Sequence, residues 1–123
     1  MNATTYVNLH CHSTCSDGRL TPEDLARQLA RGGIVFAALT DHDTVDGLPR
    51  FQDAMRRHGI GTVSGVEITT VWRGEEAHLL AYGVDPAHGE LLGTLRALRQ
   101  VRQAATQSVA EELRRTGTGD PAA

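Results

Sequence analysis

The stretch NLHCHSTCSDG (residues 8–18) places two histidines two residues apart and follows them with an Asp-Gly turn. Alternate side chains of a β-strand lie on the same face, so His10 and His12 can hold one ion together while Cys11 points into the packing behind. Imidazole nitrogens suit Zn, Mn or Fe. Asp17, on the turn, is near enough to reach the same site or a second ion. A His-x-His pair is also common in ordinary strands, so other residues of the chain must indicate whether these two histidines bind a metal.

Outward from this stretch, strand and helix patterns alternate. The β-prone residues 6–12 predict a strand, and Thr21-Pro22 predicts the start of a helix that ends before two glycines. The apolar run at residues 34–40 predicts a strand covered on both faces. The remaining expected elements are a helix at 46–58, a strand at 62–66, a hairpin of 68–71 and 77–84 with its turn at the four residues 73–76, and a long helix at about 89–115.

This alternation predicts a parallel sheet, in which functional residues collect at the carboxyl ends of the strands. The first expected strand ends in His-Cys-His, the second in Thr-Asp-His-Asp (residues 40–43), and the third at Glu67. His78 begins the strand after the hairpin turn and can reach the same rim. Each motif alone is common in strands, loops or helix caps. Their coincidence at successive strand ends predicts a shared metal site, in which Glu67 could bridge two ions.

Length and composition are typical of a small globular domain. The 123 residues suffice for one small domain, and 40% hydrophobic with 22% charged residues is ordinary for a globular chain. A net charge of −3 gives no overall basic field, so we expect no stable DNA binding. Two cysteines are too few for a disulfide scaffold. Neither a leader peptide nor a membrane span is visible, so we expect no membrane association and a cytoplasmic location.

Other polar residues receive plainer interpretations. We expect His58 to be structural, at the end of a helix, and His88 to be exposed before the long helix. Arg96, Arg99 and Arg102 on that helix could contact phosphate, but a solvated face is our expectation because two glutamates follow on the same helix.

Four segments, in order and spacing, resemble the first half of the PHP (polymerase and histidinol phosphatase) family: HCHSTCSDGRLTPEDL, LTDHDTVDGL, SGVEITT and HLLAYGVD. The resemblance covers about residues 5–115. It implies an α/β fold, the N-terminal part of a distorted (β/α)7 barrel that is incomplete in this chain. We expect a partial PHP domain at residues 1–116 and a flexible tail at 117–123. In detail the segments are most similar to the nucleoside 3′,5′-bisphosphate phosphatase and 5′–3′ exoribonuclease branch.

The resemblance implies a metal-dependent phosphoesterase with two or three divalent ions, Mn, Zn or Fe, with Mg also compatible. It assigns His10 and His12 to the first ion with Glu67 bridging. A metal-bound hydroxide would attack the phosphorus of a nucleotide (3′,5′-bisphosphate or AMP-like) or of short RNA. The other implied ligands are Asp17 and His42 for the second ion, and His78 for the third.

Three further residues receive supporting roles. Arg19 follows the first metal loop and would help to bind substrate phosphate. Asp41 and Asp43 would orient ligands from the second coordination shell, as ligating histidines usually require. A cap on the following helix is the alternative for Asp43.

The chain departs from the family at its end. The family completes its site with a later His and an Asp-x-His, and a closed barrel needs roughly 200–250 residues. We therefore expect the missing barrel half to come from the rest of a longer chain. A truncated, non-catalytic metal-binding fragment and the PHP module of a polymerase stay open as alternatives, as does a small substrate such as histidinol phosphate.

Overall fold

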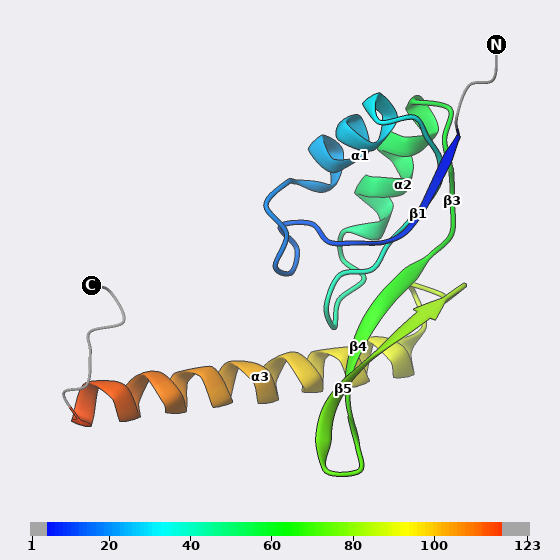
Figure 1. Ribbon diagram of the computed structural model, residues 1–123. Coiled ribbons are helices and arrows are strands. Elements are labelled where there is room, and N and C mark those ends of the chain that lie inside the picture. The colour runs from blue at the N-terminus through cyan, green and yellow to red at the C-terminus, as the bar shows by residue number, and fades with distance from the viewer. Residues whose placement is uncertain (1–4, 117–123) are drawn as a thin grey trace.

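The computed structural model describes residues 5–116, so the tail expected at 117–123 lies outside the described residues (Figure 1). Strands and helices alternate along the first half, and a hairpin and a long helix follow. The elements are β1 (Tyr6–Cys11), α1 (Pro22–Arg31), β2 (Ile34–Leu39), α2 (Leu48–Arg57), β3 (Gly61–Thr62), β4 (Gly65–Trp72), β5 (Glu75–Tyr82) and α3 (Gly89–Thr116).

Strands β1, β2 and β3 form the predicted parallel sheet in that order. Helices α1 and α2 pack together over one face of it (Figure 1). The start of α1 follows its capping sequence, because the Thr21 hydroxyl accepts a hydrogen bond of 3.1 Å from the Asp24 N–H. Leu25, Ala26 and Leu29 then face the core. The prediction for this helix is confirmed.

Helix α2 begins two residues later than predicted. The Asp46 N–H bonds to the Thr44 hydroxyl at 3.1 Å, which holds the preceding residues in a turn. Gly47 then serves as N-cap, and Pro49 lies in the first turn, where its missing N–H is tolerated. His58 ends the helix, as expected from its position.

The strand predicted at residues 62–66 is wrong, since the structure divides it between β3 and β4. Gly65 passes close to the end of β2: a Cβ there would lie 2.9 Å from Thr40 Cγ2 and 3.1 Å from Leu39 O. The chain crosses the sheet edge at this point and continues into the hairpin. Glu67 is therefore the third residue of β4 rather than a strand end, and it forms a parallel bridge with His42.

Strands β4 and β5 confirm the predicted hairpin. The turn has two residues, Arg73 and Gly74, instead of the four expected. Both have positive φ, 51° and 82°, which suits the type I′ turns that match the twist of hairpin strands.

The core lies between the sheet and the helices, and its largest fully buried side chains include Phe51, Leu48 and Met55 of α2. The expectation that β2 is covered on both faces is wrong for its first half. Val35 and Phe36 are 48% and 38% exposed, and since adjacent strand residues point to opposite faces, neither face is fully covered at the start of β2. An open apolar face is what an incomplete barrel predicts.

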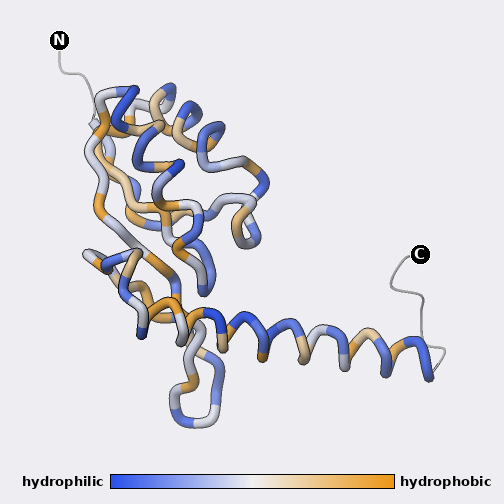
Figure 2. Tube along the Cα trace, turned by 180° about the vertical axis from the view of Figure 1, so that it is seen from behind, coloured by the Kyte–Doolittle hydropathy of each residue, from blue (hydrophilic) through white to orange (hydrophobic). Residues whose placement is uncertain are grey.

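Helix α3 packs only through its first half. Leu95 is fully buried there, and Leu91, Leu92 and Leu98 contact the core. The second half projects away from the body and is mostly hydrophilic along its length (Figure 2). None of the helices within residues 5–116 has both the length and the apolar character that a membrane span requires.

Candidate metal centre

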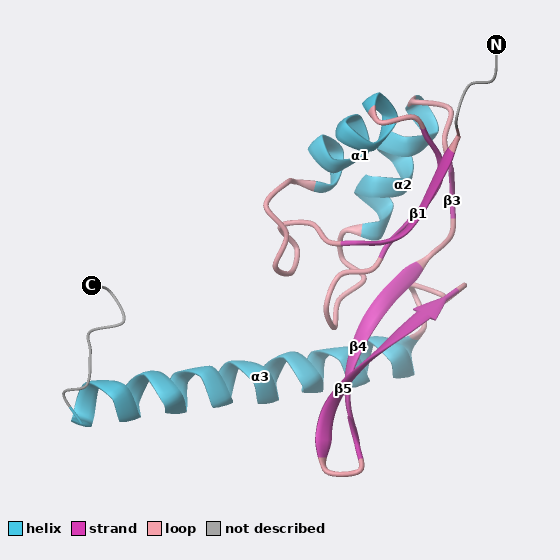
Figure 3. Ribbon diagram, in the orientation of Figure 1, coloured by secondary structure: helices cyan, strands magenta, loops and turns pink. Residues whose placement is uncertain are grey.

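The six predicted metal ligands lie in one cluster. The loop after β2 lies beside β4 (Figure 3), where His42 forms a bridge with Glu67, and ligand atoms from β1, the two loops and the hairpin lie close together. They are His10 and His12 from β1 and its end, Asp17 from the following turn, His42 after β2, Glu67 from β4 and His78 from β5.

Glu67 lies at the centre of the cluster. Its Oε1 is 2.9 Å from His10 Nε2 and 2.7 Å from His12 Nε2. Its Oε2 is 3.2 Å from His78 Nδ1. One buried carboxylate thus faces three imidazoles with its two oxygens, which is the arrangement expected of a bridging ligand.

A second carboxylate joins the other side of the cluster. Asp17 Oδ1 is 2.7 Å from His12 Nδ1, and its Oδ2 is 3.4 Å from His42 Nε2. The potential ligand atoms form three groups, and within each group the atoms lie no more than 4.8 Å from one another. These groups are His10–His12–Glu67, His12–Asp17–His42 and His42–Glu67–His78.

The electrostatics keep both carboxylates ionised. Burial raises the pKa of Glu67, but hydrogen bonds from His10 and His12 and the charge of His42 bring it below the ordinary value. Burial also raises the pKa of Asp17, and the charges of His12 and His42 lower it further than burial raises it. Ionised carboxylates are the form that binds a cation.

The donor chemistry fits a divalent metal. Imidazoles and carboxylates suit Zn, Mn and Fe, and the Nδ1 atom of His42 is buried with no hydrogen-bond partner in the described part of the chain. Cys11 is no ligand: its thiol donates to Ala38 O at 3.3 Å, on the side away from the cluster, as predicted. Burial raises the pKa of Cys11 to about 11, with a contribution from the charge of Asp41, so the thiol stays protonated.

Asp41 holds the turn that carries Asp17. The buried carboxylate accepts hydrogen bonds from Ser13 N at 2.6 Å, Ser13 Oγ at 2.7 Å and Ser16 Oγ at 2.7 Å. Asp41 was expected to orient ligands from the second coordination shell, which stays a prediction. Its hydrogen bonds hold the loop between His12 and Asp17 and join residues that are far apart in the sequence.

Asp43 was expected either to orient ligands from the second coordination shell or to cap the following helix. Its carboxylate accepts from the backbone N–H and the hydroxyl of Thr69, both at 2.7 Å, and lies 2.9 Å from Arg102 Nη2. It does not cap α2, whose N-cap is Gly47. Asp43 therefore joins the loop after β2 to the hairpin and to α3.

Arg99 and Arg102 are exposed, in line with the expected solvated face, and they also line a cavity of about 390 Å³ beside the ligands Asp17 and His42. Their spacing of three residues, one helical turn, was the available clue, because the two glutamates that suggested a solvated face lie about two turns or more further along. Arg19, expected to bind phosphate, is exposed on its loop and is not part of this cavity. The other lining residues are Cys15, Ser16, Gln103 and Thr106.

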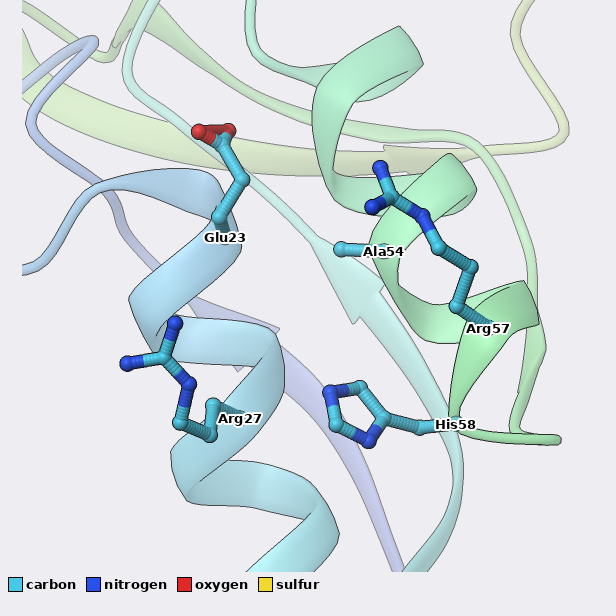
Figure 4. A pocket seen from close by; sticks show the side chains of 5 residues that line it. All are labelled: Glu23, Arg27, Ala54, Arg57 and His58. Atoms are coloured by element: carbon cyan, nitrogen blue, oxygen red, sulfur yellow. The ribbon is translucent and has the colours of Figure 1, made fainter.

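A second, smaller cavity lies between α1 and α2 (Figure 4). Its charged side chains pair with neighbours, Glu23 with Arg50 at 2.7 Å and Arg57 with Asp53. His58 lies at the edge of this cavity, at the end of α2. Its backbone N–H donates to the carbonyl oxygens of Ala54 and Met55. The structural role expected for His58 is consistent with this place, and the cavity is set apart from the metal ligands.

The turn that carries Asp17 allows a direct test. A Cβ added at Gly18 would overlap the backbone of His12 and lie 2.8 Å from Ser13 Cα. Gly18→Ala is expected to destabilise the protein by about 1–3 kcal/mol and to weaken metal binding about tenfold, because it displaces Asp17. Chemical denaturation and metal titration check this. Gly93→Ala, in open space on α3, is the control, and equal effects of both substitutions would contradict the account.

Together these features define an α/β domain with a cluster of histidines and carboxylates that could hold metal ions, where the loops after β1 and β2 meet the hairpin. The model of the PHP domain family matches residues 8–111. The chain belongs to the PHP domain family.

Its curated relatives include a 5′–3′ exoribonuclease of Haemophilus influenzae, 33% identical over 93% of this chain and 42% of the relative. A 3′,5′-nucleoside bisphosphate phosphatase of Chromobacterium violaceum is 34% identical over 90% of this chain and 39% of its own length. The chain thus spans about 40% of the curated relatives it matches.

Solved structures agree with the fold. An amidohydrolase from Chromobacterium violaceum, with bound sulfate and no metal, matches with a TM-score of 0.85 at 34% identity. The match covers 90% of this chain and 39% of that one, so the fold corresponds to the N-terminal part of a larger PHP-type structure. This confirms the expected fold class.

Proposed function

We propose that the full-length product of this gene is a metal-dependent phosphoesterase that acts on a nucleotide, of the 3′,5′-bisphosphate or AMP-like type, or on short RNA. The observation that carries the proposal is the position of Glu67. Its two oxygens face His10 and His12 on one side and His78 on the other, so one carboxylate can serve two ions. Paired ions of this kind are used for phosphoryl transfer.

The six ligands would hold two or three ions of Mn, Zn or Fe, distributed over the three donor groups. When bound, such ions activate water and neutralise charge on the phosphoryl oxygens. Glu67 and Asp17 are ionised and need no proton loss before they bind a cation. The chain itself holds these donors in position on strands and on the turn of Asp17, which hydrogen bonds to Asp41 stabilise.

Arg99 and Arg102 would bind the phosphate group. Guanidinium groups present several N–H donors in a plane, which suits phosphate oxygens. Both side chains line the cavity that also contains Asp17 and His42, so a phosphate held there lies beside the metal ligands.

The rest of the barrel is expected to complete the site. Each donor group offers only three protein ligands, and apolar side chains of β1 and β2 are exposed where further strands and helices would cover them. Further ligands would come from the part of the protein that the relatives have beyond this span. The two free thiols, Cys11 and Cys15, support our proposal of a reducing, cytoplasmic location.

The proposed activity can be measured directly. Full-length protein, stripped of metal, is assayed for phosphate release from adenosine 3′,5′-bisphosphate and from a short RNA with a 5′ phosphate, with Mn²⁺, Zn²⁺, Fe²⁺ or Mg²⁺ restored. We expect activity only with added metal. His42→Ala is expected to lower it about 100-fold or more, because His42 belongs to two of the donor groups.

The matched control is His58→Ala, which removes a histidine at the end of α2, outside the donor groups. It is expected to keep activity within about twofold of the unaltered protein. Full activity in His42→Ala, or metal-independent phosphate release, would contradict the proposal.

A further inference from the structure

Asp43 has a fully buried carboxylate that belongs to none of the metal-ligand groups. Thr69 donates two hydrogen bonds to it, and Arg102 Nη2 lies 2.9 Å from its Oδ2. A buried carboxylate requires such partners, because removal of a charge from water is strongly unfavourable unless it is paired. Arg102 is the cation in this arrangement, and it also donates to the Thr69 hydroxyl.

The backbone of Asp43 ties the same elements together. Its φ of 54° is uncommon for a residue other than glycine and is maintained by contacts on both sides. Its N–H donates to Glu67 O at 2.9 Å, and its carbonyl accepts from Arg99 Nη1 at 2.6 Å. The residue after the ligand His42 therefore holds both the strand of Glu67 and the two arginines of α3.

Arg102 has a second environment besides Asp43. Its side chain also lines the cavity that contains Asp17 and His42. The guanidinium has five N–H donors, so it can keep its bond to Asp43 and offer other donors to an anion in the cavity. A long side chain without such an anchor would lose much of its conformational freedom on binding the anion, which weakens affinity.

We propose that Asp43 is a positioning residue: it holds Arg102 at the edge of the metal-facing cavity and so sets the affinity of that cavity for a phosphate group. The inference rests on the proposed function only in taking phosphate as the occupant. Asp43 acts through Arg102 and contacts neither the phosphate nor the ions.

The test is a double-mutant cycle on the metal-free, full-length protein, with inorganic phosphate as the probe and ³¹P NMR titration as the measurement. Asp43→Asn and Arg102→Met are each expected to weaken phosphate binding about tenfold. The double variant is expected to bind as weakly as either single variant, because Asp43 has no effect without Arg102. Independent losses that multiply to about a hundredfold, or no phosphate binding by the unaltered protein, would overturn the proposal.

The control is Asp53→Asn, which removes an exposed carboxylate paired with Arg56 and Arg57 on α2 and should leave phosphate affinity within about twofold. Should Asp43→Asn fail to fold, Arg102→Lys answers the same question. Its ammonium keeps the charge but cannot serve Asp43 and the cavity at once, so a severalfold weaker affinity is expected. Unchanged affinity in Arg102→Lys would overturn the proposal. Since no turnover is measured, a protein without phosphoesterase activity can still pass or fail this test.

Discussion

Glu67→Gln is expected to lower phosphate release by the full-length protein about 100-fold or more and to reduce its metal content by at least one ion. The amide keeps the shape of the side chain but removes the negative charge that faces His10, His12 and His78. Loss of a residue that merely supports a ligand costs about 10–100-fold, and Glu67 is proposed to bind the ions directly. Initial rates at saturating metal, with metal content from mass spectrometry, measure both effects.

Glu75→Gln serves as the matched control for this substitution. Glu75 is exposed near the hairpin turn and belongs to none of the ligand groups, so its substitution should leave both values within about twofold. Activity and metal content near normal in Glu67→Gln would show that Glu67 is not a ligand.

Phe51→Ala is expected to lower the free energy of unfolding by about 3–5 kcal/mol, the range found for deletion of a buried phenylalanine. Phe51 is fully buried in α2, in the core between the helices and the sheet. Its removal leaves a cavity that the surrounding side chains can fill only in part. Chemical denaturation followed by circular dichroism gives the free energy.

Phe51→Leu is a milder substitution that retains most of the buried apolar volume. Its loss in the free energy of unfolding should be less than half of the loss caused by Phe51→Ala. A loss below about 1 kcal/mol in Phe51→Ala would place Phe51 outside the core and contradict the packing of α2 described above.

Local sequence patterns predicted the elements whose causes are local. Thr21 and Pro22 mark the start of α1, and Arg73-Gly74 lies within the four residues predicted as the hairpin turn. Strand alternation placed His10 and His12 on one face, and the order of strands placed Glu67 at the same rim. The helix start, the turn and the His10–His12 pair depend on neighbours within a few residues, whereas the place of Glu67 beside the two histidines follows from the order of the strands.

The features that the sequence did not predict depend on distant contacts. The division of the third strand follows from the close passage of Gly65 over the end of β2. Asp43 meets Thr69, 26 residues away, and Arg99 reaches Asp43 across 56 residues. The three-residue spacing of Arg99 and Arg102 places them on one face of α3, but the residues that this face meets lie far away in the sequence and are brought there by the fold.

Glu67 is proposed to join two groups of histidines around bound metal ions. An anomalous difference map from crystals of the full-length protein grown with Mn²⁺ tests this proposal. A peak is expected in contact with Glu67 Oε1 and the Nε2 atoms of His10 and His12, and a second peak between Glu67 and His78. A map at saturating Mn²⁺ with no peak in contact with Glu67 would show that Glu67 is not a metal ligand.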